Sequence, residues 1–125
     1  MSGARDVVTG FQAAMGKDDW AGARRHLADK FQFVGPFESL SNPDDYLTAL
    51  RRLHPIVERV DVKKVFVDGD DVCVLYDLVT NSPAGTAFIA EWHHVHAGKI
   101  DAIRVVFDAR PFAPMMAKGA GPGGA

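Results

Sequence analysis

The feature that most constrains the fold is the stretch from Gly85 to Asp108, GTAFIAEWHHVHAGKIDAIRVVFD. It consists of two runs rich in aromatic and β-branched residues, joined at Ala97-Gly98. Such residues favour strands, and a glycine between two such runs suits a tight turn. The stretch therefore predicts a β-hairpin.

Charged and titratable residues lie inside this hairpin, and strand geometry sorts them into two faces. Alternate residues of a strand point to the same side. One face would carry Ile89, Glu91, His93 and Val95, and the other Trp92, His94 and His96. Both faces are partly apolar, so neither is expected to be simply solvated. We expect one face to line an interior and the other to meet a second layer or a second subunit.

The rest of the chain predicts helices before the hairpin and further strands leading into it. Helical spacing of apolar residues covers residues 4–16, 19–28 and 43–54, with a short strand at 31–34. Strand patterns follow from residue 56 to 68 and from 72 to 80, and a change of parity at Lys63-Lys64 suggests a β-bulge. Helices followed by antiparallel strands indicate an α+β domain whose helices cover one face of a curved sheet.

Composition narrows the class of protein. A chain of 125 residues that is 47% apolar and carries a net charge of −2 fits one domain, here residues 1–115, followed by a flexible Gly/Ala-rich tail at 116–125. No basic stripe indicates nucleic-acid binding, and no apolar segment approaches the roughly 20 residues of a membrane span. The single cysteine, Cys73, is expected to be buried between valines and favours a reducing, cytoplasmic setting.

The element order, together with GKIDAIRVVFDARPF near the end, resembles the nuclear transport factor 2-like superfamily. Within it the chain is similar to SnoaL-like and ketosteroid-isomerase-like proteins. The shared features are Trp92, Gly98-Lys99-Ile100, Arg104 and Phe107-Asp108, and the resemblance covers roughly residues 4–112. It implies a cone-shaped barrel whose curved, mainly antiparallel sheet wraps around the N-terminal helices. That fold hosts isomerases, hydrolases, cyclases and non-catalytic proteins, so the activity must be argued from the site.

Two reactions of this superfamily are not expected here. The oxyanion-binding acid of ketosteroid isomerase falls at or beside Glu91, but its base falls at Gly35 and its tyrosine near Phe11. In limonene-epoxide hydrolases an aspartate directly follows the arginine of the last strand. Here Val105 follows Arg104.

Three residues are candidates for catalysis: Glu91, Asp77 and His93. Glu91 would face the cavity, where burial raises its pKa unless Arg104 or a histidine pairs with it. Its alternative role is a structural acid or a partner of Arg104. Asp77 interrupts an apolar strand and would be either a base near Glu91 or an outward residue at a dimer surface. His93 would be a base or a wall residue.

The expected ligand-binding residues are mostly apolar, with Tyr46 and His54 on the helix at the mouth of the cavity. They are Phe11, Phe33, Tyr46, Leu50, His54, Ile103, Val105 and Phe107. His94 and His96 have a spacing that two metal ligands could use, but no third ligand is evident and an interface is the plainer interpretation. Arg104 and Asp108 suggest a structural or intersubunit ion pair. We expect no metal and no cofactor.

Two hypotheses for the function remain open. The first is an isomerase, cyclase or hydrolase that works without a cofactor by acid–base chemistry on a small apolar molecule. The second is a non-catalytic dimeric module that binds a ligand or has a structural role. In either case we expect a homodimer formed through the outer face of the sheet, because Trp92 and its neighbours are apolar.

Overall fold

The structure is a computed structural model that describes residues 3–115. The predicted tail at 116–125 lies outside the described residues. The helices are α1 (Ala4–Gly16), α2 (Trp20–Arg25), α3 (Pro43–Leu53) and α4 (Ala113–Met115), with short 3-10 turns η1 (His54–Ile56) and η2 (Arg110–Phe112). The strands are β1 (Leu27–Val34), β2 (Ser39–Leu40), β3 (Val57–Asp68), β4 (Asp71–Thr80), β5 (Thr86–His96) and β6 (Lys99–Val106).

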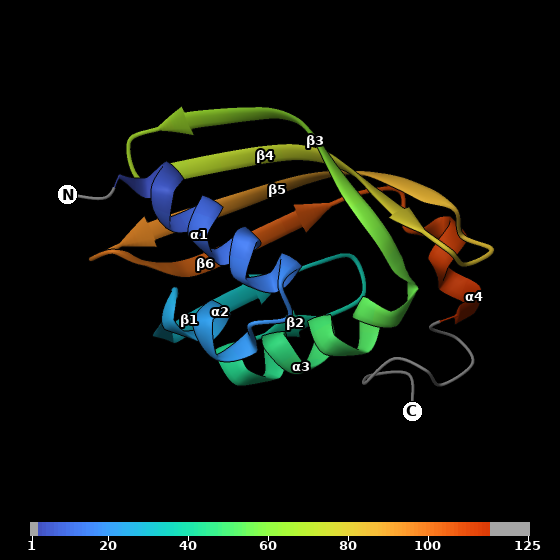
Figure 1. Cartoon of the computed structure of the whole chain (residues 1–125), viewed down its shortest axis with the longest axis horizontal. Coiled ribbons are helices and arrows are strands. Elements are labelled where there is room, and N and C mark those ends of the chain that lie inside the picture. The colour runs from blue at the N-terminus through green and yellow to red at the C-terminus, as the bar shows by residue number, and fades with distance from the viewer. Residues whose placement is uncertain (1–2, 116–125) are drawn as a thin grey trace.

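The six strands form one curved sheet in the order β2-β1-β6-β5-β4-β3. Neighbouring strands are antiparallel except β1 and β6, which are parallel. Figure 1 shows α1 lying across the concave face of the sheet, with α2 and α3 on the same side. This arrangement confirms the predicted α+β class and the curved, mainly antiparallel sheet around the N-terminal helices.

Local chemistry sets the helix starts. The Asn42 side chain accepts hydrogen bonds from the backbone N–H groups of Asp44 and Asp45, and Pro43 occupies the first turn of α3. At the start of α2, the Asp19 side chain caps the helix by accepting from Gly22 N at 2.9 Å. Asp18 occupies the turn before α2, with a φ of 58°.

The predicted second helix was too long at its C-terminal end. Leu27, which falls inside the predicted helix range of 19–28, begins β1 instead and pairs with Ile100 of β6. The backbone N–H of Ile100 donates to the carbonyl of His26 at 2.8 Å, immediately before β1. This pairing joins segments more than 70 positions apart, so local helical spacing carried no sign of it.

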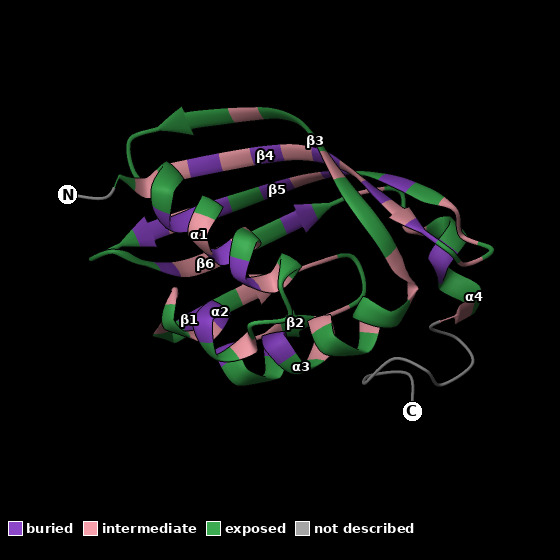
Figure 2. Cartoon of the chain, viewed as in Figure 1, coloured by how far each residue is buried: buried purple, intermediate pink, exposed green. Residues whose placement is uncertain are grey.

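The faces of the long strands follow the predicted parity. Buried and more exposed residues alternate along β4 and β5 (Figure 2), and Ile89, Glu91, His93 and Val95 are all buried while Trp92 is exposed. The predicted bulge is also present, as a register shift between Val62 and Lys64. The buried side chains of α1 pack against the inner face in one continuous core.

None of the helices within residues 3–115 is both long and apolar enough to cross a membrane.

Candidate functional site

The inner face of β4 and β5 brings three polar side chains into direct contact. Val74 of β4 lies opposite Glu91 of β5, so Tyr76 is the diagonal neighbour of Glu91 on the same face. The Tyr76 hydroxyl donates to Glu91 Oε1 at 2.5 Å, and His93 Nε2 lies 2.7 Å from Glu91 Oε2. Each carboxylate oxygen therefore has one hydrogen-bonded neighbour from the protein.

Hydrogen-bond chemistry fixes the protons of this network. His93 Nδ1 lies 3.2 Å from the carbonyl oxygen of Val72, and a carbonyl only accepts, so Nδ1 carries a hydrogen. One further proton then lies between His93 Nε2 and Glu91. When this proton is bound to the imidazole ring of His93, His93 and Glu91 form an imidazolium–carboxylate pair. His93 is 0% exposed and Glu91 6%, so Glu91 carries the small exposed fraction of this pair.

The pKa of Glu91 depends on its partners as well as on its burial. Burial acts to raise the pKa, but the charge of His93 and the hydrogen bonds from His93 and Tyr76 outweigh burial, and the pKa lies below its ordinary value. The exception stated for Glu91 in the sequence analysis therefore applies, because a histidine pairs with the carboxylate. Glu91 is thus an ionised hydrogen-bond acceptor at neutral pH.

Tyr46 of α3 stands near this network inside an aromatic cluster. Its ring centroid lies 4.7 Å from that of Phe33, 5.2 Å from Phe31 and 6.4 Å from Phe11. Burial first, and then the negative charge of Glu91, raise the pKa of Tyr46 well above its ordinary value. Within residues 3–115 the Tyr46 hydroxyl makes no hydrogen bond to another side chain or to the backbone. It remains a neutral donor on the inner side.

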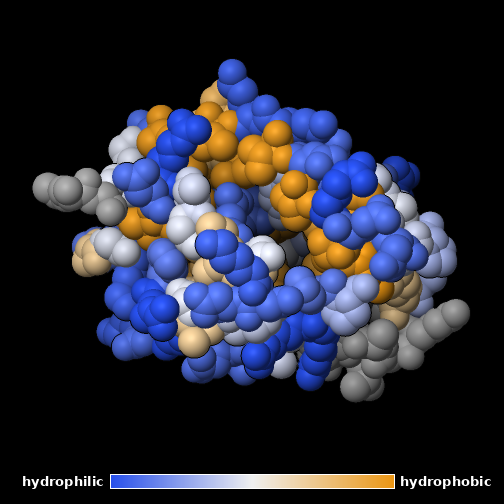
Figure 3. Space-filling model, in the orientation of Figure 1, coloured by the Kyte–Doolittle hydropathy of each residue, from blue (hydrophilic) through white to orange (hydrophobic). Residues whose placement is uncertain are grey.

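The face of the molecule that carries α1 and α3 is hollowed. Figure 3 shows the hollow near the centre of this face, with apolar side chains gathered along much of its border. Because α1 and α3 lie over the concave face of the sheet (Figure 1), the hollow opens toward the side on which Glu91 and Tyr76 lie. An apolar border with a few polar groups inside is typical of small-molecule sites.

The predicted ligand-binding residues divide into three groups. Phe11, Tyr46, Ile103 and Val105 are buried in the core, and Val105 lies opposite Glu91 in the β5–β6 pairing. Phe33, Leu50 and Phe107 are half-buried against the core. His54 is exposed. Its Nε2 lies 2.8 Å from Asp18 Oδ1, and its ring meets the edge of Trp20, so it lies at the surface beside the α1–α2 turn.

The structure does not bring Asp77 to Glu91. Asp77 alternates with Tyr76 and Leu78, which point inward, so it lies on the outer face. Its Oδ2 is 3.5 Å from Lys63 Nζ. Grouping Asp77 with Glu91 was therefore wrong in geometry, and the other interpretation of Asp77, as an outward residue, fits its position.

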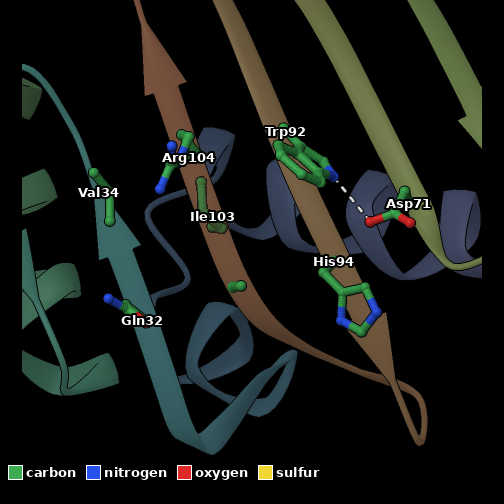
Figure 4. Close-up of a pocket in the computed structure, with 8 residues that line it drawn as sticks. Gln32, Val34, Asp71, Trp92, His94, Ile103 and Arg104 are labelled. Carbon is green, nitrogen blue, oxygen red and sulfur yellow. Dashed lines mark hydrogen bonds between the residues drawn. The ribbon is translucent and has the colours of Figure 1, made fainter.

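The outer face of the sheet is apolar and carries a depression. Phe88 is 58% exposed and Trp92 52%, and Phe66 and Val106 are exposed to a similar degree. Figure 4 shows the depression, where Val34, Arg104, Trp92 and Asp71 come from four neighbouring strands. Its volume is about 420 Å³, and its lining includes Gln32, Val34, Trp92, His94, Ala102 and Arg104.

Two other polar residues considered in the sequence analysis, His94 and Asp108, have ion-pair partners that were not predicted. His94 Nδ1 lies 2.7 Å from Asp101 Oδ1, which raises the pKa of His94. Arg110, not Arg104, binds both oxygens of Asp108, so the structural Arg104–Asp108 pair does not form within the chain. Across residues 3–115, no three histidine, cysteine or acidic side chains gather into a possible metal site.

Tyr76 is the site residue that the sequence did not reveal. It lies in the strand that also holds Asp77, and only the register of β4 against β5 shows which of the two meets Glu91. A tyrosine in an apolar strand is a weak signal by itself, because tyrosine also favours strands.

Comparison with known proteins agrees with this architecture. Residues 8–103 match the SnoaL-like domain, so the chain belongs to the SnoaL-like family, within the nuclear transport factor 2-like superfamily. The fold is that of a small-molecule-binding domain. A comparison with curated proteins gives no match.

Solved structures show the same fold. A nuclear transport factor 2-like protein of unknown function from Cytophaga hutchinsonii is 27% identical, with a TM-score of 0.79 over 90% of this chain and 96% of that one. A protein from Kribbella flavida is 26% identical, with a TM-score of 0.80 over 93% and 96%. TerC co-crystallised with polyporic acid is 15% identical, with a TM-score of 0.76 over 90% and 97%, and shows the fold alone.

Proposed function

We propose that the concave side of the sheet binds a small, uncharged and mainly apolar molecule whose hydroxyl group donates a hydrogen bond to Glu91. The observation that supports this most is the geometry of the carboxylate. Tyr76 and His93 each occupy one oxygen of Glu91, and a carboxylate oxygen accepts more than one hydrogen bond. An acceptor fixed in this way is suited to orient a ligand.

The charge of the site supports an uncharged ligand. Glu91 and His93 compensate each other, so a charged ligand group would enter a buried region without a free counter-ion. A polar group that makes hydrogen bonds avoids this cost. Tyr46 supplies a donor for a second, accepting atom of the ligand, and the surrounding aromatic rings supply apolar contact.

Binding can be tested with 2-naphthol, which has an apolar body and one hydroxyl, against 2-naphthoate, which replaces the hydroxyl by a charged carboxylate. Calorimetric titration should show heat of binding for naphthol and much weaker binding for naphthoate. Tyr46→Leu should weaken naphthol binding, and Asp77→Asn, on the outer face, should leave it unchanged. Equal binding of the two probes, or naphthol binding that does not respond to Tyr46→Leu, would contradict the proposal.

A second candidate function is proton transfer on such a ligand, as in a cofactor-independent isomerase, cyclase or hydrolase. The proton held between His93 and Glu91 favours it, because the pair can exchange a proton with a ligand through the accessible Glu91. His93 itself is enclosed and acts through Glu91. Deuterium exchange at the carbons next to the carbonyl of 2-tetralone, followed by NMR, should then be faster with the protein than in buffer. Exchange at the buffer rate would reject this candidate.

We also propose that the protein is a homodimer formed through the outer face of the sheet. Phe66, Phe88, Trp92 and Val106 are exposed on strands that lie side by side, and such apolar faces are typical of protein interfaces. Sedimentation velocity at micromolar concentration should give the mass of two chains. A monomer under these conditions would reject this part of the proposal.

A further inference from the structure

This inference depends on the proposed homodimer and specifies how its two copies meet. We propose that Phe88 of each copy inserts into the outer depression of the other, and that Asp77 beside Phe88 forms an ion pair with Arg104 at the rim of that depression. Both halves of the contact lie on the same face of one chain. The partner is therefore a second copy of the protein.

The depression has fixed walls and an open rim. The indole Nε1 of Trp92 donates to Asp71 at 2.8 Å, and His94 binds Asp101, so both rings are held in place. Figure 4 shows the Arg104 side chain beside Val34, with no dashed line to another residue drawn there. Among the residues the structure describes, the Arg104 side chain makes no hydrogen bond and no ion pair. A depression of about 420 Å³ accommodates a phenyl ring.

The projecting group is Phe88, which lies four residues before Trp92 on β5 and is separated from it by the small Ala90 on the same face. Asp77 of β4 lies directly opposite Phe88 in the pairing of the two strands. An apolar ring and a carboxylate therefore project together from one point of the outer face, at a distance from the depression along the same strand.

Two-fold symmetry makes this arrangement close on itself. In an isologous interface residue i of one copy contacts residue j of the other, and j contacts i in return. A two-fold axis that lies in the interface, between Phe88 and the depression, exchanges the two positions. Each Phe88 then enters the other copy's depression, and no further copy can be added.

Charge selects Asp77 as the partner of Arg104. A second copy that covers Arg104 must supply an acid, because a buried unpaired charge is strongly destabilising. On this face Asp71 and Asp101 are bound to Trp92 and His94, and Asp61 is bound by Arg59 at 3.1 Å. Asp77 has only the 3.5 Å contact with the exposed Lys63. A surface pair of this kind contributes little, so Asp77 can change partner at small cost.

A charge-exchange experiment tests the pairing in the full-length protein. Sedimentation equilibrium would give the dimer dissociation constant for wild type, Asp77→Arg, Arg104→Asp and the double variant. Each single change should weaken the dimer by roughly 30-fold or more, the loss typical of one partner of a buried charge pair. The double variant should recover most of the affinity. The matched control, Asp61→Arg with Arg104→Asp, should not recover it.

Phe88→Ser tests the apolar half of the contact and should also weaken the dimer. All of these residues are exposed or partly exposed in the single chain, so circular dichroism should show an unchanged fold. Dimeric single variants with wild-type affinity, or a double variant without recovery, would overturn the pairing while the homodimer stands. A monomeric wild type would overturn the homodimer and the pairing together.

Discussion

The two faces of β4 and β5 differ in how their polar groups are satisfied. On the inner face Glu91, His93 and Tyr76 bind one another, and His93 is also bound to a backbone carbonyl. On the outer face the exposed Trp92 lies opposite Arg104, whose side chain makes no ion pair among the described residues. On the inner face most polar side chains already have partners within the chain, and the remaining room suits a small molecule. On the outer face a charged side chain lacks a partner and apolar rings are exposed, which suits a large apolar partner.

This difference between the faces results from strand geometry, in which successive side chains point to opposite sides of the sheet. Trp92 lies between Glu91 and His93, so one strand segment supplies both the ion pair and the apolar surface. A slip of one position in the pairing would exchange the two faces and bury the wrong set. The inner ion pair and the outer aromatic residues therefore specify the same register.

The largest expected effect comes from removing the charge of Glu91. Glu91→Gln leaves the buried His93 without its counter-ion, and breaking a buried pair typically costs about 3–5 kcal/mol of unfolding free energy. Urea unfolding of wild type and Glu91→Gln at pH 7 measures this loss of unfolding free energy. The outer-face control, Asp61→Asn, breaks a partly exposed pair with Arg59 and should cost no more than about 1 kcal/mol. Equal effects of the two changes would contradict the contrast between the faces.

The same carboxylate should make stability depend on pH. Because the pKa of Glu91 is lowered in the folded protein, its stabilising contribution is complete above its ordinary value of 4.5 and is lost as the pH falls through the folded pKa. Unfolding free energies should therefore fall on acidification below about pH 4.5, and the loss should be smaller in Glu91→Gln. Parallel curves for the two proteins would place Glu91 outside any ion pair.

The two buried tyrosines of the inner side should respond differently to loss of the hydroxyl. Tyr76→Phe removes a hydrogen bond to a charged group and should cost about 1.5–3 kcal/mol of unfolding free energy. Tyr46→Phe removes a hydroxyl that has no partner among the described residues, so it should not lower stability. Chemical denaturation of wild type and of both variants gives the unfolding free energies to be compared. A larger loss for Tyr46→Phe would show that the hydroxyl of Tyr46 is engaged.

The sequence predicted the fold more completely than the site. The hairpin, the bulge at Lys63-Lys64 and the inward parity of Glu91 follow from local patterns, and the structure confirms them. The β1–β6 pairing and the Tyr76–Glu91 contact depend on register between distant segments, which alternation within one strand does not fix. For the same reason the sequence left the side of Asp77 open. For the pKa of Glu91 the sequence could only state the two cases, burial alone or pairing with Arg104 or a histidine, and the structure shows the pairing with His93.

The smallest expected effect concerns Cys73, which lies opposite Trp92 on the outer face and is half-buried. The sequence predicted full burial, but the valines beside it point inward and Cys73 points outward. Burial and then the charge of Glu91 raise the pKa of the thiol, so it should react slowly even in the monomer. A thiol reagent should label it more slowly as the protein concentration rises and the dimer forms. A rate independent of concentration would place Cys73 outside the interface.

Pairing of an ionised Glu91 with a charged His93 on the inner face can be tested by ¹⁵N NMR of the histidine ring at pH 7. Both ring nitrogens of His93 should carry hydrogen and show the shifts of an imidazolium, because Nδ1 lies against the Val72 carbonyl and Nε2 against the Glu91 carboxylate. Glu91→Gln provides the matched control, in which these shifts should change. A neutral His93 ring in the wild type at pH 7 would contradict the ion pair and the role of Glu91 as an ionised acceptor.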